Sequence, residues 1–168
     1  RAQVNIVEDM RVFLQTTLDA FSAHTAVLAS DGTIINVNES WVKFAEENGS
    51  PSSAHYVGTN YLTTCETATS AKSEEATPAA EGIRAVIDAF QDEFYLEYPC
   101  HSPDEERWFG MHVTPFPESA PRRVVLAHMN ITDRVLSAQR LEEQRYQLNE
   151  RVKELGCLYE HSKFLEQR

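Results

Sequence analysis

The chain has 168 residues, of which 26 are acidic and 15 are basic, so its formal net charge is −11. This length suits one domain with an extension, and a hydrophobic content of 42% is enough for a core. The acidity disfavours nucleic acid and anionic membrane as partners, and no apolar run approaches the roughly 20 residues that cross a bilayer. Because the chain begins at Arg1 rather than Met, we expect it to be part of a longer protein.

Residues 1–22 are predicted to form an amphipathic helix. Apolar residues recur at spacings of three and four and share one narrow face: Val7, Met10, Leu14, Leu18 and Phe21. This face needs a partner, which is either the neighbouring domain or the same helix of a second copy.

A β-hairpin is predicted next. Residues 24–30 and 33–38 have the pattern of strands, and Asp31-Gly32 between them is typical of a tight two-residue turn. Asn38 can then cap the helix that follows.

A helical block follows the hairpin. A short helical turn is expected from residue 60, residues 66–77 are predicted to form a mobile surface segment, and Thr77-Pro78 indicates the start of another helix. That helix has an apolar face made of Ile83, Val86, Ile87 and Phe90.

Three strands are predicted in the second half, at residues 94–98, at residues 107–116 and from residue 123. Runs of strands on both sides of a helical block, with no helix between consecutive strands, predict an α+β fold with an antiparallel sheet.

The last strand changes directly into a long helix that starts near residue 135. Polar residues at the junction can cap this helix and complement its dipole. We therefore expect a signal from the sheet to leave through four residues: Asn130, Thr132, Asp133 and Arg134.

The long helix carries a seven-residue apolar repeat that is typical of a coiled coil. The expected seam consists of Leu141, Leu148, Val152, Leu155 and Tyr159. Arg145 occupies an equivalent position, and Leu158 and Leu165 form a second series out of phase with the first. Two competing registers predict a seam that can shift.

In this order, the features resemble a PAS domain over roughly residues 11 to 134. DGTIINVNESWVKFA resembles the opening of such a domain, and the stretch from GTNYL through PAAEGIRAVIDAF resembles its helical middle. FYLEYPCHSPDEERWFGMHVTPF is similar to its central hairpin. The closing NITDR is similar to the Asp-Ile-Thr-Glu/Asp-Arg signature at the exit, with Asn130 where the family usually has Asp.

The resemblance implies a five-stranded antiparallel sheet with helices on one face that enclose a pocket. It divides the chain into a flanking helix at residues 1–22, a sensor domain at residues 23–133 and a signalling helix at residues 134–168. It also implies a homodimer that signals through the flanking helices. RVKELGCLYEHSKFLEQ resembles the linker of bacterial sensor kinases, which implies a C-terminal output domain such as a histidine kinase. The candidate pocket residues are Trp41, Phe44, Tyr61, Ile83, Ile87, Phe94, Trp108, Met111 and His128.

The sequence does not identify a cofactor. Haem-binding PAS domains usually carry a His on the helix that matches residues 78–90, which has none here. Flavin-binding members of the LOV type place a reactive Cys directly after the Asn that matches Asn60, where this chain has Tyr61. A cysteinyl–flavin photocycle is therefore not expected, while haem, a non-covalent flavin and a core filled by the chain's own aromatic residues remain alternatives.

The three cysteines cannot all pair, which favours a reducing compartment, so we expect the cytoplasm. Cys65 and Cys100 could form a reversible disulfide or could be two inert thiols. Cys100-His101 lies in a turn-rich loop without a second Cys/His pair at zinc spacing, so no metal site is expected. We find no nucleophile elbow, phosphate loop or catalytic carboxylate pair, and we expect no enzyme.

The leading hypothesis is a sensory module that passes a signal from its pocket to an output domain by a shift in conformational population. The alternatives are a dimerisation and relay module without a ligand, and a redox or gas sensor that uses haem or flavin.

Overall fold

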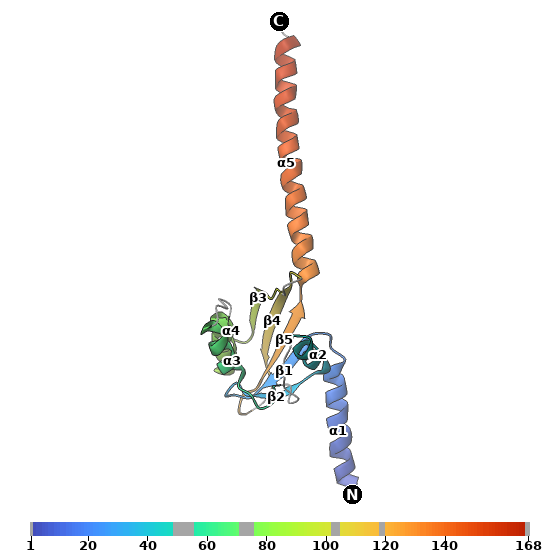
Figure 1. Ribbon diagram of the computed structural model, residues 1–168, viewed down its shortest axis with the longest axis vertical. Coiled ribbons are helices and arrows are strands. Elements are labelled where there is room, and N and C mark those ends of the chain that lie inside the picture. Colours follow the sequence, from blue (N-terminus) through green and yellow to red (C-terminus); the bar gives the residue numbers. More distant parts are fainter. Residues whose placement is uncertain (1, 49–55, 71–75, 102–104, 118–119, 167–168) are drawn as a thin grey trace. The chain divides into compact units, whose positions relative to one another are not determined.

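The structure is a computed structural model that describes residues 2–48, 56–70, 76–101, 105–117 and 120–166. The chain divides into two compact units, one ending at Asn130 and the other starting at Ile131 (Figure 1). The first unit contains α1 (Ala2–Asp19), β1 (His24–Leu28), β2 (Ile34–Val37), α2 (Glu39–Glu47), α3 (Tyr61–Ser70), α4 (Ala76–Ile87), β3 (Phe94–Pro99), β4 (Trp108–Pro115) and β5 (Val124–Asn130). The second unit contains α5 (Thr132–Glu166).

The strands form one five-stranded sheet in the order β2-β1-β5-β4-β3. Every neighbouring pair is antiparallel. The last strand in sequence, β5, is therefore the middle strand and joins the β1–β2 hairpin to the β3–β4 hairpin. The predicted α+β fold with an antiparallel sheet is confirmed.

The β1–β2 turn differs from the two-residue type that Asp31-Gly32 predicts. The Ala29 N–H donates to the Thr33 carbonyl at 2.8 Å, and the Gly32 N–H donates to the Ala29 carbonyl at 2.9 Å. The loop therefore has three residues, and its last residue, Gly32, has a φ of +85°. A Cβ on Gly32 would lie 2.6 Å from Leu62 Cδ1, so close packing also requires glycine here.

The helical block extends further than its pattern predicts. Residues 66–70 are the last part of α3, and α4 begins at Ala76, so both ends of the expected surface segment are helical. The rest of that segment, residues 71–75, lies outside the described residues. Phe90 follows the end of α4 and is 83% exposed, so it does not belong to the buried face of that helix.

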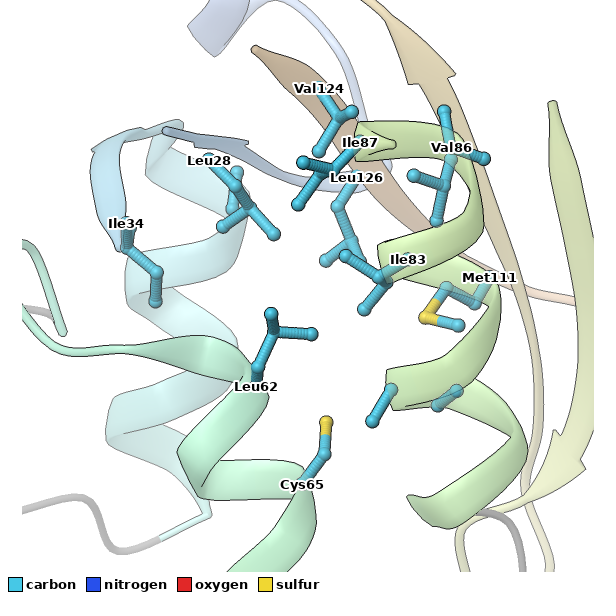
Figure 2. Packing of buried hydrophobic residues seen from close by; sticks show 14 of the residues in the cluster. Leu28, Ile34, Leu62, Cys65, Ile83, Val86, Ile87, Met111, Val124 and Leu126 are labelled. Carbon is cyan, nitrogen blue, oxygen red and sulfur yellow. The ribbon is translucent and has the colours of Figure 1, made fainter. Parts of the chain in front are cut away.

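The main core lies between the sheet and the helices α2, α3 and α4. Leu28, Met111 and Leu126 point from the strands toward Leu62 of α3 and Ile83 of α4, as Figure 2 shows. Full burial of one such side chain contributes about 1.5–3 kcal/mol to folding. The helices thus cover one face of the sheet, as the PAS resemblance implies.

Asn38 joins the end of α1, the start of β1 and the start of α2. Its Oδ1 accepts hydrogen bonds from the backbone N–H groups of Thr25 at 2.9 Å and Trp41 at 3.0 Å. The second of these bonds confirms the predicted helix cap. The Asn38 Nδ2 group donates to three carbonyls, those of Leu18, Phe21 and Ala23.

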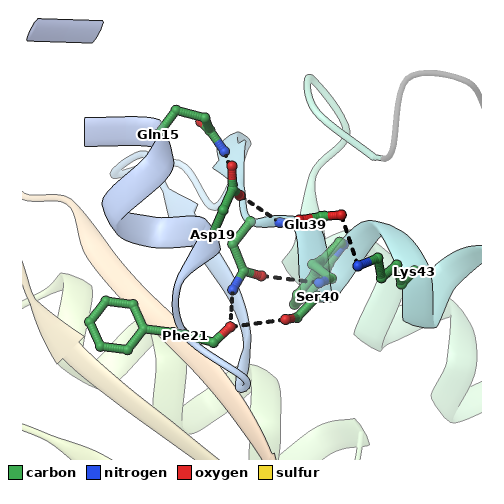
Figure 3. Close-up of polar contacts among 8 residues, drawn as sticks. Gln15, Asp19, Phe21, Glu39, Ser40 and Lys43 are labelled. Atoms are coloured by element: carbon green, nitrogen blue, oxygen red, sulfur yellow. Dashed lines mark hydrogen bonds and ion pairs between the residues drawn. The ribbon is translucent and has the colours of Figure 1, made fainter. Parts of the chain in front are cut away.

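Further polar contacts attach the end of α1 to α2 (Figure 3). The Asp19 carboxylate accepts from the Glu39 N–H and from Gln15 Nε2, and Ser40 Oγ donates to the Phe21 carbonyl. The C-terminal end of α1 is therefore part of the first unit, whereas Val7, Met10, Leu14 and Phe21 are each more than half exposed.

The second unit is the single helix α5, which begins at Thr132 and has Asp133 in its first turn. The Ile131 carbonyl accepts the Val135 N–H at 3.0 Å, which closes that turn. The residues of the expected seam are 60–68% exposed: Leu141, Leu148, Val152, Leu155 and Tyr159.

Candidate functional site

A group of aromatic and polar side chains lies at the end of the sheet where β5 finishes. Inward-facing residues alternate along each strand, because successive side chains point to opposite faces. The strand register places His24 of β1 opposite His128 of β5, and Tyr98 of β3 opposite Phe109 of β4. Polar and aromatic residues thus replace the aliphatic core at this end of the sheet.

These side chains surround a cavity of about 250 Å³. The strands contribute His24, Ile34, Tyr98, Phe109 and His128, α2 contributes Trp41, Phe44 and Ala45, and α3 contributes Tyr61 and Thr64; Asn48 and Tyr56 complete the lining. Among the described residues, none that lines the cavity is Lys, Arg, Asp or Glu. The described lining thus suits an apolar or uncharged polar molecule, and the charge of Arg107 lies next to it, with its Cζ 5.9 Å from the Phe44 ring and its Nη2 donating to Asn48 Oδ1 at 3.2 Å.

The aromatic rings contact one another around the cavity. His24 stacks on Phe44 with 4.4 Å between ring centroids, and Phe44 meets the Phe109 ring edge-on at 5.4 Å. The Trp41 ring lies 5.7 Å from that of His128. Flat side chains with few rotatable bonds give this wall a defined shape.

His128 is the buried polar centre of the site. Its Nδ1 atom lies 2.6 Å from the Tyr98 hydroxyl, and its Nε2 atom lies 3.1 Å from the Tyr61 hydroxyl. Burial, with a smaller contribution from nearby His24, lowers the pKa of His128 to about 3. The imidazole is therefore neutral at pH 7, with one nitrogen as donor and the other as acceptor.

Burial also keeps both tyrosine partners protonated. It raises the pKa of Tyr61 and of Tyr98 above the usual value of a phenol. The nearby Cys65 thiol has its pKa raised to about 11, again mainly by burial. Tyr98, His128 and Tyr61 thus form a hydrogen-bonded chain of neutral groups at the cavity wall.

PAS domains are among the solved structures that share this arrangement of strands and helices. The PAS domain of BvgS from Bordetella pertussis superposes with a TM-score of 0.54 at 14% identity, covering 83% of this chain and 98% of that one. The chain has the PAS fold. A structure of an RNA-binding light-oxygen-voltage receptor gives a TM-score of 0.55 at 19% identity over 83% of this chain and 37% of that one.

In sequence, the chain is 43% identical over 121 residues to an uncharacterised 104.1 kDa protein encoded in the hypE 3′ region of Rhodobacter capsulatus. The match covers 71% of this chain but only 13% of the length of that protein. No model of a known protein family matches the chain.

Four of the predicted pocket residues line the cavity of the PAS fold: Trp41, Phe44, Tyr61 and His128. Ile83, Ile87 and Met111 are instead buried in the aliphatic core. Phe94 packs against that core, and its ring lies 2.3 Å from the position that a Cβ on Gly82 would occupy.

Trp108 also lies away from the cavity. It is one position before Phe109 on β4, so its side chain points to the other face of the sheet, where it contacts the His101 ring at 4.9 Å. Trp108 and Met111 cannot face the same side of a regular strand, because they are three residues apart. Phe109 lines the cavity in place of Trp108.

Sequence reasoning missed several lining residues, among them His24, Tyr98 and Phe109. The alternation of Phe94, Leu96 and Tyr98 was a usable signal for Tyr98. His24 had no such signal, because only the pairing of β1 with β5 places it beside His128.

The predicted relay residues lie where the two units join in sequence. Asn130 is the last residue of β5, and Thr132, Asp133 and Arg134 form the start of α5. His128 is two positions before Asn130 on the same strand.

Cys65 is buried, Cys100 is partly buried, and no disulfide joins them. The described part of the chain has no group of three or more His, Cys, Asp or Glu residues that could hold a metal ion.

No helix among the described residues is long and apolar enough to cross a membrane. Both nitrogens of His128 lie within hydrogen-bonding distance of tyrosine hydroxyls.

Proposed function

We propose that the first unit is a sensory module that binds a small uncharged molecule in the cavity beside His128. The observation that carries this proposal is the position of His128, which lines the cavity and lies on β5, the strand that leads into α5. A ligand that shifts His128 or its partners would act on the strand next to the relay residues Asn130 to Arg134. The signal would be a shift between conformational states that already exist.

The cavity supports a ligand sensor over a relay module whose core is filled by its own side chains. Its volume of about 250 Å³ is slightly below the 300–1,000 Å³ of ordinary small-molecule sites, so the expected ligand is small. The role proposed for these residues is regulatory, and catalysis is assigned to no residue here. The reduced state of Cys65, Cys100 and Cys157, none of which is in a disulfide, supports a cytoplasmic location.

We also propose that two copies pair through α5 and that the seam passes the signal to a C-terminal output domain such as a histidine kinase. The exposed seven-residue repeat from Leu141 to Tyr159 supports this pairing, because a lone helix would leave these side chains in water. The exposed apolar residues of α1 support a second contact between the same two copies.

The ligand proposal is tested by an absorption spectrum of the freshly purified chain, followed by denaturation and mass spectrometry of released small molecules. Ala45→Leu should abolish co-purification, because Ala45 lines the cavity and a larger side chain would fill it. Glu46→Leu adds the same side chain at the next, exposed position of α2 and should leave ligand recovery unchanged. Equal recovery from both variants would place the ligand outside the cavity.

The dimer proposal is tested by the mass in solution of the variant Leu148→Asp with Leu155→Asp. Two buried charges in the seam should convert the dimer to a monomer. Gln147→Asp with Glu154→Asp changes neighbouring exposed positions outside the seam and should stay dimeric. A double seam variant that keeps the wild-type mass would exclude pairing through this seam.

A further inference from the structure

We propose that the Tyr98–His128–Tyr61 chain selects ligands that carry an uncharged hydrogen-bond acceptor, such as a carbonyl oxygen, to which Tyr61 donates. This inference rests on the proposed ligand-binding function and adds the chemical class of the ligand and the residue that recognises it. Both tyrosines line the cavity, so the hydroxyl hydrogen at either end of this hydrogen-bonded series is available to a bound molecule.

A count of hydrogens shows that one hydroxyl hydrogen is always left over. At pH 7 the neutral imidazole of His128 has one N–H, and Tyr61 and Tyr98 have one O–H each. Two hydrogen bonds join the three groups and use two of these three hydrogens. If Nδ1 carries the imidazole proton, the remaining hydrogen belongs to Tyr98, and if Nε2 carries it, the remaining hydrogen belongs to Tyr61.

The lengths of the two bonds favour the second arrangement. Bonds donated by a hydroxyl group are usually about 2.7–2.8 Å long, whereas those donated by N–H are about 2.9–3.0 Å long. The 2.6 Å contact therefore fits a Tyr98 O–H that donates to Nδ1, and the 3.1 Å contact fits an Nε2–H that donates to Tyr61. The direction of donation is from Tyr98 through His128 to Tyr61, which leaves the Tyr61 hydrogen to the next acceptor.

The Cys65 thiol interacts with the Tyr61 hydroxyl. Sulfur is a weak hydrogen-bond acceptor, whereas a carbonyl oxygen or a ring nitrogen is a strong one. A ligand that offers such an atom in the cavity would therefore accept the Tyr61 hydrogen more strongly than the Cys65 sulfur can. This change at the Tyr61 hydroxyl would alter its hydrogen bond with His128 on β5.

The same site disfavours charged ligands. The described lining residues include no Lys, Arg, Asp or Glu, and burial lowers the pKa of both lining histidines, His24 and His128. An ionised ligand would lose its hydration, which is costly, and the Arg107 guanidinium, which contacts the lining residues Phe44 and Asn48, already donates to Asn48 Oδ1 and to the Cys100 carbonyl. The rings of Trp41, Phe44 and Phe109 favour a flat apolar body next to the acceptor atom.

Three probe compounds of similar shape test the proposal on the full chain by NMR-detected titration. Acetophenone has the neutral acceptor, α-methylstyrene replaces its carbonyl with a carbon–carbon double bond, and benzoate carries a charge. We expect acetophenone to bind about five- to tenfold more tightly than α-methylstyrene, the effect of one buried hydrogen bond. Benzoate should bind at least about tenfold more weakly than acetophenone, because its charge must be desolvated.

Tyr61→Phe should reduce the preference for acetophenone over α-methylstyrene at least about threefold, because it removes the donor and keeps the ring. Tyr56→Phe makes the same change at a lining residue that does not belong to the hydrogen-bonded series Tyr98–His128–Tyr61, so this variant should keep the wild-type preference. The ¹⁵N shifts of His128 should show a protonated Nε2 and an unprotonated Nδ1 in the ligand-free protein.

Equal binding of acetophenone and α-methylstyrene to the wild-type chain would overturn this inference while the ligand-binding function stands. A preference that survives Tyr61→Phe unchanged, or a protonated Nδ1, would also overturn the assignment to Tyr61. If none of the three compounds binds, both the inference and the proposed binding of small neutral molecules in this cavity fail.

Discussion

The carboxylate of Asp19, the last residue of α1, accepts a 2.7 Å hydrogen bond from the backbone N–H of Glu39, the first residue of α2. The first N–H groups of a helix have no partner within the helix, so Asp19 supplies one across 20 residues of sequence. A negative charge at this point also complements the helix dipole. Since α2 carries Trp41 and Phe44 to the cavity, α1 is bound directly to the helix that forms one wall of the site.

Asp19→Ala should release the end of α1 and destabilise the first unit by about 0.5–2 kcal/mol, the usual cost of a lost helix cap. Urea unfolding would measure this change, and hydrogen exchange should become faster at the Glu39 amide. Asp9→Ala removes an exposed carboxylate from the same helix and is the matched control. Equal stability of the two variants would show that the Asp19 contact adds nothing to the fold.

The stability of the protein should fall as the pH drops below about 6.5, and His128 should be a main cause. Burial lowers the pKa of His128 to about 3, so the unfolded chain binds a proton between about pH 6.5 and pH 3 that the folded chain does not. The His128 contribution is therefore fully present above pH 6.5 and is lost as the pH falls, by up to about 1.4 kcal/mol per pH unit. His24 acts in the same direction, because burial also lowers its pKa.

Urea unfolding at several pH values between 7 and 5 would test this dependence. Whatever its stability at pH 7, the His128→Gln variant should lose less free energy of unfolding per pH unit than the wild type. His161→Gln, which changes an exposed histidine of α5, should follow the wild-type curve. Parallel curves for the wild type and His128→Gln would contradict the low pKa of His128.

Gly82 of α4 is predicted to tolerate no larger residue. A Cβ at this position would lie 2.3 Å from the ring of Phe94, which packs against the core on β3. Gly82→Ala should therefore destabilise the first unit by about 1–3 kcal/mol, even though alanine favours a helix. Thermal unfolding is the measurement.

Gly156 of α5 offers the opposite case. Apart from the adjacent residues and the backbone of its own helix, a Cβ there would have no heavy atom within 4 Å, so Gly156→Ala should gain up to about 1 kcal/mol in helix stability. The circular dichroism of the helix on heating would show this gain. If both glycine variants changed stability in the same direction, the packing account of Gly82 would be incorrect.

The Cys65 thiol is predicted to react slowly with alkylating reagents. Burial raises its pKa to about 11, so at pH 8 its thiolate fraction is roughly a hundred times smaller than that of an ordinary cysteine. Iodoacetamide should label the exposed Cys157 well before Cys65, as peptide mass spectrometry can show. In urea, where Cys65 is no longer buried, both cysteines should be labelled at the same rate. Equal rates in the folded chain would contradict this prediction and would indicate a reactive Cys65.

The sequence alone determined the order of the elements, the type of nearly every element and the PAS resemblance. These features depend on short-range rules: the period of apolar residues, the cap at Asn38 and the repeat along α5. The prediction of the β1–β2 turn failed because Asp31-Gly32 suits more than one loop length, and the packing of Gly32 on Leu62 is a tertiary contact.

Only the tertiary structure decided the composition of the site. The partners of His128 lie 67 and 30 residues away, and no local pattern could bring Tyr61 and Tyr98 to opposite sides of one imidazole. The strand register also decided that Phe109, and not Trp108, faces the cavity. The physical reason is that helix and strand propensities act over a few residues, whereas a cavity is formed by side chains that meet only when the sheet and its helices pack together.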